Sequence, residues 1–215
     1  MKQLQTSGLT GKRVAVLMTD GVEQVEYTGP REFLERHGAK VTLVSPKPAG
    51  EEVQGFRHLK PADRFRVEKN LGDASAADFD ALVLPGGVAN PDQLRLEPDA
   101  LSFIRDFAEQ DKTIAAICHG PWPLIDAGVV AGKRVTSWLS LQQDLRNAGA
   151  QWTDESVVVD GKLVTSRKPD DIPAFDQALL ESLGGRSTKP APVEKHSVSE
   201  RVNNVQEAPG AQHSG

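Results

Sequence analysis

The chain has one cysteine, no excess of basic residues and no long apolar run, and each shortage excludes a class of protein. One cysteine in 215 residues cannot form a disulfide within the chain, a Cys-x-x-Cys redox pair or a cysteine-rich zinc site. The formal net charge of -5 argues against nucleic-acid binding, which favours a basic surface. No stretch approaches the roughly 18 apolar residues of a membrane span, and the first residues lack the apolar core of a secretion signal. We therefore expect a cytoplasmic protein that binds neither nucleic acid nor membrane.

The two ends of the chain differ in composition from its middle. Residues 185–215 contain no Leu, Ile, Phe, Trp or Tyr and are rich in Ser, Pro, Asn and Gln. Such a segment cannot bury enough apolar surface to offset the entropy of ordering it. We expect a disordered tail there, with a partner-binding arm as the alternative, and a flexible N-terminus over residues 1–11. Residues 12–184 are expected to form one domain.

Apolar runs and amphipathic stretches alternate through this domain. A continuous apolar run, typical of a strand buried on both faces, covers residues 14–18, and further strands are expected over residues 41–44, 81–84 and 113–117. Stretches with helical spacing cover residues 23–37, 100–109, 141–148 and 170–183, with a shorter one ending at 127. Asp160-Gly161 between two short apolar runs predicts a β-hairpin, and residues 50–73 are expected to carry loops or edge strands. The alternation predicts an α/β fold: a doubly wound, mostly parallel sheet with helices on both faces, as in flavodoxin-like proteins.

In such a sheet, ligands bind outside the carboxyl ends of the strands. This rule selects the loops that follow three of the predicted strands. Their chemically useful residues are Glu23 in the first loop, Gly86, Gly87 and Asp92 in the second, and Cys118 with His119 in the third.

Cys118 stands between a small apolar strand and a Gly120-Pro121 pair that suits the first turn of a helix. Strand, cysteine, sharp turn and helix is the layout of a nucleophile elbow, although Ala116 stands where the Gly-x-Ser-x-Gly version has a glycine. We expect a strained backbone at Cys118 and a sulfur at the positive end of a helix, which would lower the thiol pKa. The alternative is a buried, inert cysteine.

Two interpretations are open for Glu23. If Glu23 meets Cys118 it should be protonated and donate a hydrogen bond, because an ionised carboxylate would raise the thiol pKa. Alternatively, Glu23 only places a negative charge at the N-terminus of its own helix.

The remaining candidates also have two interpretations each. His119 can be a catalytic base oriented by a carboxylate, for which Asp92 is the loop candidate, or a histidine satisfied by a nearby acid. Gly86 and Gly87 can let backbone amides approach a developing oxyanion, together with the amide after Cys118, or can belong to an ordinary loop.

No motif for a nucleotide or a metal is present. The chain has no Gly-x-x-x-x-Gly-Lys-Ser/Thr, no Gly-x-Gly-x-x-Gly and no His-Glu-x-x-His sequence. The other histidines, His37, His58, His196 and His213, have no metal-ligand spacing. We expect neither a cofactor nor a metal.

Several separated motifs together resemble one family. The sequence FDALVLPGG at residues 79–87, followed by AAICHGP at 115–121, closely resembles the PfpI-type intracellular cysteine peptidase and deglycase family of the class I glutamine amidotransferase-like superfamily. EQVE at 23–26, NAGA at 147–150 and VVVDG at 157–161 match it as well. The resemblance covers roughly residues 12–183 and leaves the tail outside it.

The resemblance implies a role for four residues. Cys118 matches the family nucleophile, Glu23 the acid that hydrogen-bonds the thiol, and His119 the catalytic histidine. In this family the cysteine and the histidine form a catalytic triad with an acid from a neighbouring subunit. Asp92 lies near the position of that acid, where other members of the family can have a glutamate. The resemblance therefore also implies a homo-oligomer, either a homodimer or a hexamer.

Together, these features predict a cofactor-independent cysteine hydrolase of stress defence. Its substrates would be small carbonyl compounds, glycated proteins or peptides, as for a deglycase or a glyoxalase-like enzyme, or else peptide bonds. The alternative is a redox-sensing or chaperone-like stress protein whose single cysteine oxidises to the sulfinic acid without turnover. His119 favours the enzyme, since sensing needs no base.

Overall fold

The computed structural model describes residues 8–185, which are built around a seven-stranded sheet. Six strands are parallel, and the edge strand β11 runs antiparallel to β12. In spatial order the strands are β11 (Val157–Asp160), β12 (Leu163–Ser166), β8 (Thr113–Ile117), β7 (Ala81–Leu84), β1 (Arg13–Leu17), β3 (Lys40–Ser45) and β6 (Lys69–Asn70). The predicted α/β fold with a mostly parallel sheet is confirmed.

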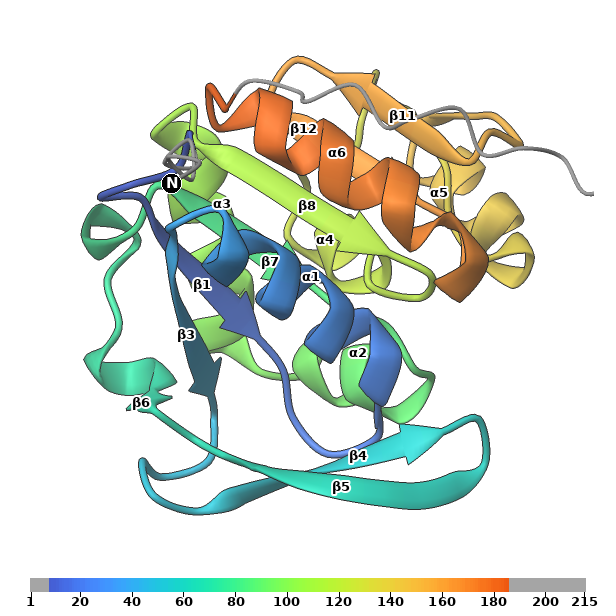
Figure 1. The fold of residues 1–215 in the computed structure, drawn as a ribbon. Helices are drawn as coiled ribbons and strands as arrows, with labels where there is room; N and C mark the ends of the chain where they lie inside the picture. Colours follow the sequence, from blue (N-terminus) through green and yellow to red (C-terminus); the bar gives the residue numbers. More distant parts are fainter. Residues whose placement is uncertain (1–7, 186–215) are drawn as a thin grey trace, which may run out of the picture.

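Helices cover both faces of this sheet (Figure 1). Helices α1 (Gln24–Arg36) and α6 (Ile172–Ser182) pack together on one face, and α3 (Pro98–Glu109), α4 (Trp122–Asp126) and α5 (Gln142–Asn147) cover the other with the short α2 (Ala89–Leu94). Successive residues of a strand point to opposite faces, so Val14 and Val16 join one core while Ala15 and Leu17 join the other. Continuous apolar strands are therefore needed, as the sequence pattern indicated.

The smaller elements surround this framework. They are β9 (Arg134–Val135) paired with β10 (Gln151–Trp152), and the short 3₁₀ helices Leu71–Asp73, Ala76–Asp78, Leu139–Leu141 and Pro169–Asp171. The hairpin predicted at Asp160-Gly161 is present, because β11 and β12 pair in register from Val157 with Ser166 to Asp160 with Leu163. Gly161 has φ +62, the left-handed conformation that a tight hairpin turn requires.

The stretch 50–73 forms a projecting hairpin rather than loops alone. Strands β4 (Glu52–Arg57) and β5 (Lys60–Arg66) pair antiparallel, and the two-residue β2 (Val22–Glu23) joins β4 to complete a small sheet (Figure 1). The hairpin turns at His58 and Leu59, where His58 has φ 55 and the Leu59 side chain is 92% exposed. A long, mostly exposed hairpin thus lies beside the carboxyl edge of the main sheet.

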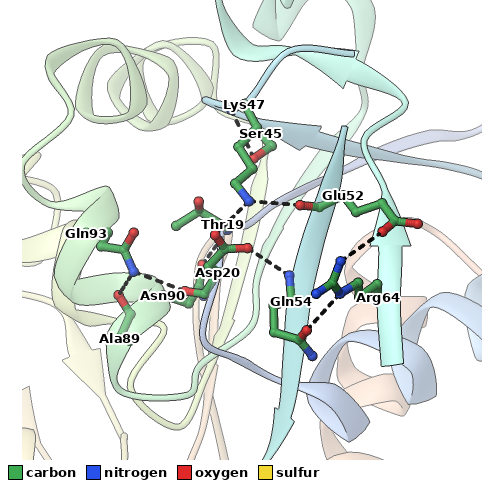
Figure 2. Close-up of polar contacts among 10 residues, drawn as sticks. All are labelled: Thr19, Asp20, Ser45, Lys47, Glu52, Gln54, Arg64, Ala89, Asn90 and Gln93. Atoms are coloured by element: carbon green, nitrogen blue, oxygen red, sulfur yellow. Dashed lines mark hydrogen bonds and ion pairs between the residues drawn. The ribbon is translucent and has the colours of Figure 1, made fainter. Parts of the chain in front are cut away.

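A polar network fastens the base of this hairpin to the sheet (Figure 2). The Asp20 carboxylate accepts a hydrogen bond from Gln54 N at 2.8 Å and pairs with Lys47 Nζ at 2.6 Å. Close by, the buried Asn90 side chain accepts from Thr19 N at 2.7 Å. These bonds join the ends of β1 and β3, the start of α2 and strand β4 at the edge where ligands bind such sheets.

The predicted domain boundary at residue 12 needs correction. Leu9 is fully buried in the core under α1, and its backbone N–H donates to His37 O at 3.1 Å. The ordered domain therefore includes the residues from Gly8 onward, because Leu9 contributes apolar surface to the core. Residues 1–7 of the expected flexible N-terminus 1–11, and all of the expected disordered tail 185–215 except Gly185, lie outside the described residues. Between residues 8 and 185, no helix is long and apolar enough to cross a membrane.

Candidate active site

Cys118 occupies a strained turn directly after strand β8. Its φ is 62, a conformation that costs a residue with a side chain roughly 1–2 kcal/mol. Backbone bonds hold the turn from both sides, because Cys118 N donates to Ser166 O and Cys118 O accepts from Trp138 N at 2.8 Å. A Cβ on Gly120 would lie 2.1 Å from Leu84 O, so this glycine lets the chain leave the turn. The strained backbone expected of a nucleophile elbow is therefore present.

The carboxyl group that interacts with the thiol belongs to Glu26. Glu26 lies in the first turn of α1 and is fully buried, and its Oε2 accepts a hydrogen bond from Gly86 N at 2.8 Å. Burial, reinforced by the nearby charge of Glu23, raises the pKa of Glu26 to about 8, although its bonds to Gly86 and Cys118 act in the opposite direction. Its second oxygen, Oε1, has no hydrogen-bond partner within residues 8–185, so Oε2 is the oxygen that faces the thiol. Glu26 is thus a neutral acid beside the sulfur at neutral pH.

The expectation that Glu23 would contact the thiol is wrong. Glu23 precedes α1, and its Oε2 accepts from His58 N at 2.9 Å, so it holds the tip of the β4–β5 hairpin instead. The sequence does contain a pattern that identifies Glu26. Glu26, Pro30 and Leu34 follow one another at intervals of four, which places this acid on the buried stripe of the helix. Glu23 lies outside that stripe because the helix begins at Gln24.

His119 is the second group that faces the sulfur. Its Nδ1 lies 3.2 Å from Cys118 Sγ, and its Nε2 lies 3.3 Å from Ser140 Oγ. The ring stacks on Trp138 with 5.8 Å between centroids and 25° between planes. Burial lowers the pKa of His119, which favours the neutral imidazole that can accept a proton.

The electrostatic environment corrects the expectation of an anionic sulfur. Burial raises the pKa of the Cys118 thiol, and the charge of an ionised Glu26 raises it further. The backbone N–H groups of His119 and Gly87 hydrogen-bond the sulfur and act in the opposite direction. Helix α4 has five residues and begins only at Trp122, so its end gives little support to a charge on the sulfur. The resting thiol is therefore protonated, and its reactivity depends on a neighbouring base.

The two candidate glycines have different roles. The N–H of Gly86 already donates to Glu26, so it is not free for an oxyanion, whereas the N–H of Gly87 bonds to the sulfur. Gly87 has φ +77, and a Cβ there would lie 2.2 Å from Gly21 O. Asn90, seen in Figure 2, fixes this loop because its Nδ2 donates to Gly86 O at 3.1 Å. The amides of Gly87 and His119 are thus the pair that faces the reacting atoms.

Asp92 is not brought to His119 within the chain. It is exposed in the first turn of α2, and the ring nitrogens of His119 bond to Cys118 and Ser140 instead. The contribution of Asp92 to the site of a neighbouring subunit stays a prediction.

A cavity of about 320 Å³ opens onto the sulfur. Its lining residues come from β2 and the first turn of α1, from the loops after β7 and β8, from the hairpin tip and from two later segments: Glu23, Glu26, His58, Leu59, Gly87, Val88, Cys118, His119, Trp138 and Pro169. None of these is lysine or arginine. In the described range 8–185, no group of three or more His, Cys, Asp or Glu side chains is placed to hold a metal ion.

The structure defines a class of α/β proteins in which a doubly wound sheet places one buried cysteine on a strained turn, between an acid and a histidine. The sequence model of the DJ-1/PfpI family matches residues 12–182. The chain belongs to the DJ-1/PfpI family.

Relatives with names are similar over most of the domain. YraA of Bacillus subtilis (strain 168), provisionally named a cysteine protease, is 42% identical over 172 residues, which are 80% of this chain and 98% of that one. Protein/nucleic acid deglycase 2 of Escherichia coli (strain K12) is 42% identical over 174 residues, with the same coverage of both chains. The crystal structure of Drosophila melanogaster DJ-1beta superposes with a TM-score of 0.74 at 32% identity, covering 81% of this chain and 91% of that one. These likenesses support a family-level function in cysteine-based protease or deglycase chemistry.

Proposed function

We propose that this protein is a cofactor-independent cysteine hydrolase that acts on small reactive carbonyl compounds or on their early adducts with amino groups. The observation that carries the proposal is the placement of Cys118 Sγ 3.2 Å from His119 Nδ1, with the neutral acid Glu26 beside it and a cavity in front. The name of the deglycase relative supports the carbonyl class of substrate.

The reaction begins with proton transfer and thiol addition. His119 Nδ1 takes the thiol proton as Sγ forms a bond to the carbonyl carbon, and the C=O electron pair moves to the oxygen. The N–H groups of Gly87 and His119, which already hydrogen-bond the sulfur, lie close enough to donate to that oxyanion. Glu26 supplies the proton that converts the oxyanion to a hydroxyl.

For methylglyoxal the adduct then rearranges and is hydrolysed. Proton transfer through Glu26 and His119 moves the hydrogen of the former aldehyde carbon to the adjacent carbon and leaves a thioester. Water attacks the thioester, the C–S bond breaks, and the sulfur recovers its proton. The sum is methylglyoxal plus water to lactate, so no oxidant or cofactor is consumed.

The shape and charge of the cavity favour small, uncharged carbonyls. The hairpin tip with His58 and Leu59 closes one side of the cavity, whereas a peptide substrate needs an open groove. The lining carries the Glu23 carboxylate and no lysine or arginine, so an anionic substrate would meet no fixed positive charge.

Burial of the thiol disfavours the redox-sensor alternative. Sensor cysteines are exposed thiolates, because oxidation follows thiolate character and access. Cys118 is 6% exposed, and burial raises its pKa. A thiol of this kind needs a base placed within reach, which His119 supplies.

Turnover of methylglyoxal, measured as lactate released, tests the proposal. The wild-type chain should produce lactate, and Cys118→Ala should abolish production. Ser102→Ala, which removes an exposed hydroxyl from α3, should behave as wild type. Lactate production by Cys118→Ala, or no turnover of methylglyoxal or glycated peptides by the wild type, would overturn the assignment.

A further inference from the structure

The loop that follows β9 is built around His119. Trp138 N donates to Cys118 O at 2.8 Å, and the Trp138 ring stacks on the imidazole. Ser137 is almost fully buried, and its Oγ donates to Trp138 O at 2.9 Å while accepting from Trp152 Nε1 at 3.0 Å. Ser140 follows in the 3₁₀ turn Leu139–Leu141 and places its Oγ 3.3 Å from His119 Nε2. The loop is thus anchored in the core at one end and contacts the catalytic ring at the other.

The donors around the sulfur determine which nitrogen of His119 is free. The backbone N–H groups of Gly87 and His119 both bond to Cys118 Sγ, and the neutral Glu26 has a proton to donate there. Glu26 Oε2 is already occupied by the N–H of Gly86. When Glu26 is neutral and donates to the sulfur, His119 Nδ1, 3.2 Å from Sγ, is the acceptor for the S–H group. Nδ1 must be unprotonated to accept, so the ring proton is on Nε2.

A proton on Nε2 needs an acceptor, and Ser140 Oγ is the atom in reach. Between residues 8 and 185, no carboxylate bonds to the ring. Ser140 is exposed, so its own O–H can turn to solvent while Oγ accepts from the ring. The hydrogen bonds then run in one direction from Glu26 through the sulfur and His119 to Ser140, and bonds in such a chain strengthen one another.

We propose that Ser140, seated by Trp138, is the positioning residue of His119, holding the ring with its proton on Nε2 so that Nδ1 can take the thiol proton of Cys118. This inference rests on the proposed function for its consequence in turnover, but the state of the ring is independent of any substrate. When the thiol proton moves from Sγ to Nδ1, the imidazolium keeps Ser140 as the acceptor at Nε2. The proton returns to the sulfur when the product leaves.

A serine in this position differs from the acid of a triad. A hydroxyl accepts a hydrogen bond but adds no negative charge, so it orients the imidazolium without strongly stabilising it. The other titratable groups of the same cavity are Glu23, Glu26, His58 and Cys118. None of them bonds to Nε2, so a change at Ser140 acts on the far side of the ring from the sulfur.

Variants at Ser140 test this role by turnover. Ser140→Ala should lower kcat/KM for methylglyoxal about tenfold, the effect of losing one hydrogen bond of ordinary strength. Ser140→Thr, which keeps the hydroxyl, should recover most of the activity. Ser140→Asp places a carboxylate beside Nε2 and should move the acidic limb of the pH profile to higher pH, which a purely structural role would not do. Ser102→Ala is the matched control for removing an exposed hydroxyl.

Nitrogen-15 NMR of the imidazole gives a readout that needs no turnover. The His119 resonances, assigned by their absence in His119→Gln, should report the Nε2–H tautomer in the wild type and a mixture in Ser140→Ala. The rate at which iodoacetamide alkylates Cys118 should fall in Ser140→Ala and recover in Ser140→Thr.

Two results would overturn the inference. One is an unchanged tautomer and alkylation rate in Ser140→Ala. The other is a loss of activity in Asp92→Asn without any loss in Ser140→Ala, which would give the orienting role to an acid of a neighbouring subunit. If the wild type turns over no carbonyl substrate while the tautomer still depends on Ser140, the proposed function fails and the positioning of the ring stands.

Discussion

Among residues 8–185, two buried carboxyl groups have a raised pKa, one in the site on α1 and one on α6, the other helix of the same layer. Burial is the first cause in both cases, raising the pKa of Glu26 to about 8 and that of Asp176 to about 7. Asp176 lies on the buried stripe of α6 and makes no hydrogen bond within residues 8–185, and the nearby charge of Arg36 is the one influence that lowers its pKa. Glu26 has the N–H of Gly86 on one oxygen and the thiol of Cys118 beside it.

The difference shows what a perturbed pKa can and cannot identify. Burial keeps each of the two acids protonated near neutral pH. The protonation state alone therefore does not distinguish an acid of a functional site from an acid that is only buried in the core. Glu26 can exchange its proton with a nucleophile that faces a cavity, whereas Asp176 is neither in that cavity nor hydrogen-bonded to a reacting group. We therefore expect changes at Glu26 to alter catalysis and changes at Asp176 to alter the pH dependence of stability.

The largest effect is expected from Glu26→Gln. Glutamine can still accept from Gly86 N and donate to the sulfur, so the fold should persist, but it cannot give up or take a proton. We expect kcat for methylglyoxal to fall by about 100-fold or more, the usual contribution of a general acid or base. Lactate production, with circular dichroism as the check on folding, measures this.

Asp176→Asn is the matched change for Glu26→Gln, since it also replaces a buried acid by its amide. Its kcat should stay within about twofold of wild type, because Asp176 touches no reacting group. Equal losses of kcat in the two variants would mean that both act through stability, and the contrast between the regions would disappear.

The next largest effect is expected in the pH dependence of kcat/KM, which should report the ionisation of Glu26. With a pKa of about 8, Glu26 loses its proton above that pH, and its negative charge then opposes thiolate formation at Cys118. We expect kcat/KM to decline by up to about tenfold per pH unit above pH 8. The residual activity of Glu26→Gln should lack this alkaline limb, and a limb that persists in the variant would assign the titration to another group.

The ionisation of Asp176 should affect the free energy of unfolding rather than the catalytic activity. The folded protein keeps the Asp176 proton up to about pH 7, whereas the unfolded chain releases it near the ordinary value of 3.8, so this group's stabilising contribution is full at low pH and is lost as the pH rises through 7. The loss amounts to about 1.4 kcal/mol per pH unit between those values for one fully coupled group. Urea unfolding at pH 5 and pH 8 should therefore show a smaller difference for Asp176→Asn than for wild type. A difference equal to that of wild type would show that Asp176 is ionised in the folded state.

The sequence predicted the framework well because the sheet depends on a local pattern. The runs that became β1, β3, β7 and β8 are apolar at their buried positions except for Ser45 and Thr113, and Gly161 has the backbone freedom that the hairpin turn needs. Cys118 could be placed on a strained turn for the same reason, since strand, small residues and Gly120 are adjacent in the chain.

The partners of the sulfur could not be predicted in the same way, because they depend on side-chain direction and on distant segments. Glu23 and Glu26 differ by three positions at the start of a helix, and only the phase of the buried stripe separates them. Ser140 lies 21 positions from His119, and nothing local in its sequence marks it as a neighbour of the ring. The effect of burial on the thiol pKa also exceeds what a short helix can offset, and that balance requires the packed structure.

The smallest effect is expected from Glu23→Ala, which removes the second acid of the cavity, the one to which the family resemblance gave the role at the thiol. Removing its carboxylate leaves His58 N without an acceptor, so the hairpin tip should close the cavity less firmly. We expect KM to rise about threefold with little change in kcat, as for the loss of one exposed hydrogen bond that acts on binding. The alkaline limb of the pH profile should also move to lower pH. The Glu23 charge contributes to the raised pKa of Glu26, so removing that charge lets Glu26 lose its proton at a lower pH. Glu23→Gln, which retains an acceptor for His58, should keep the KM of the wild type. A loss of kcat as large as that of Glu26→Gln would instead mean that Glu23 acts on the sulfur during turnover, and the distinction between a partly exposed acid that shapes the cavity and a buried acid that moves a proton would no longer hold.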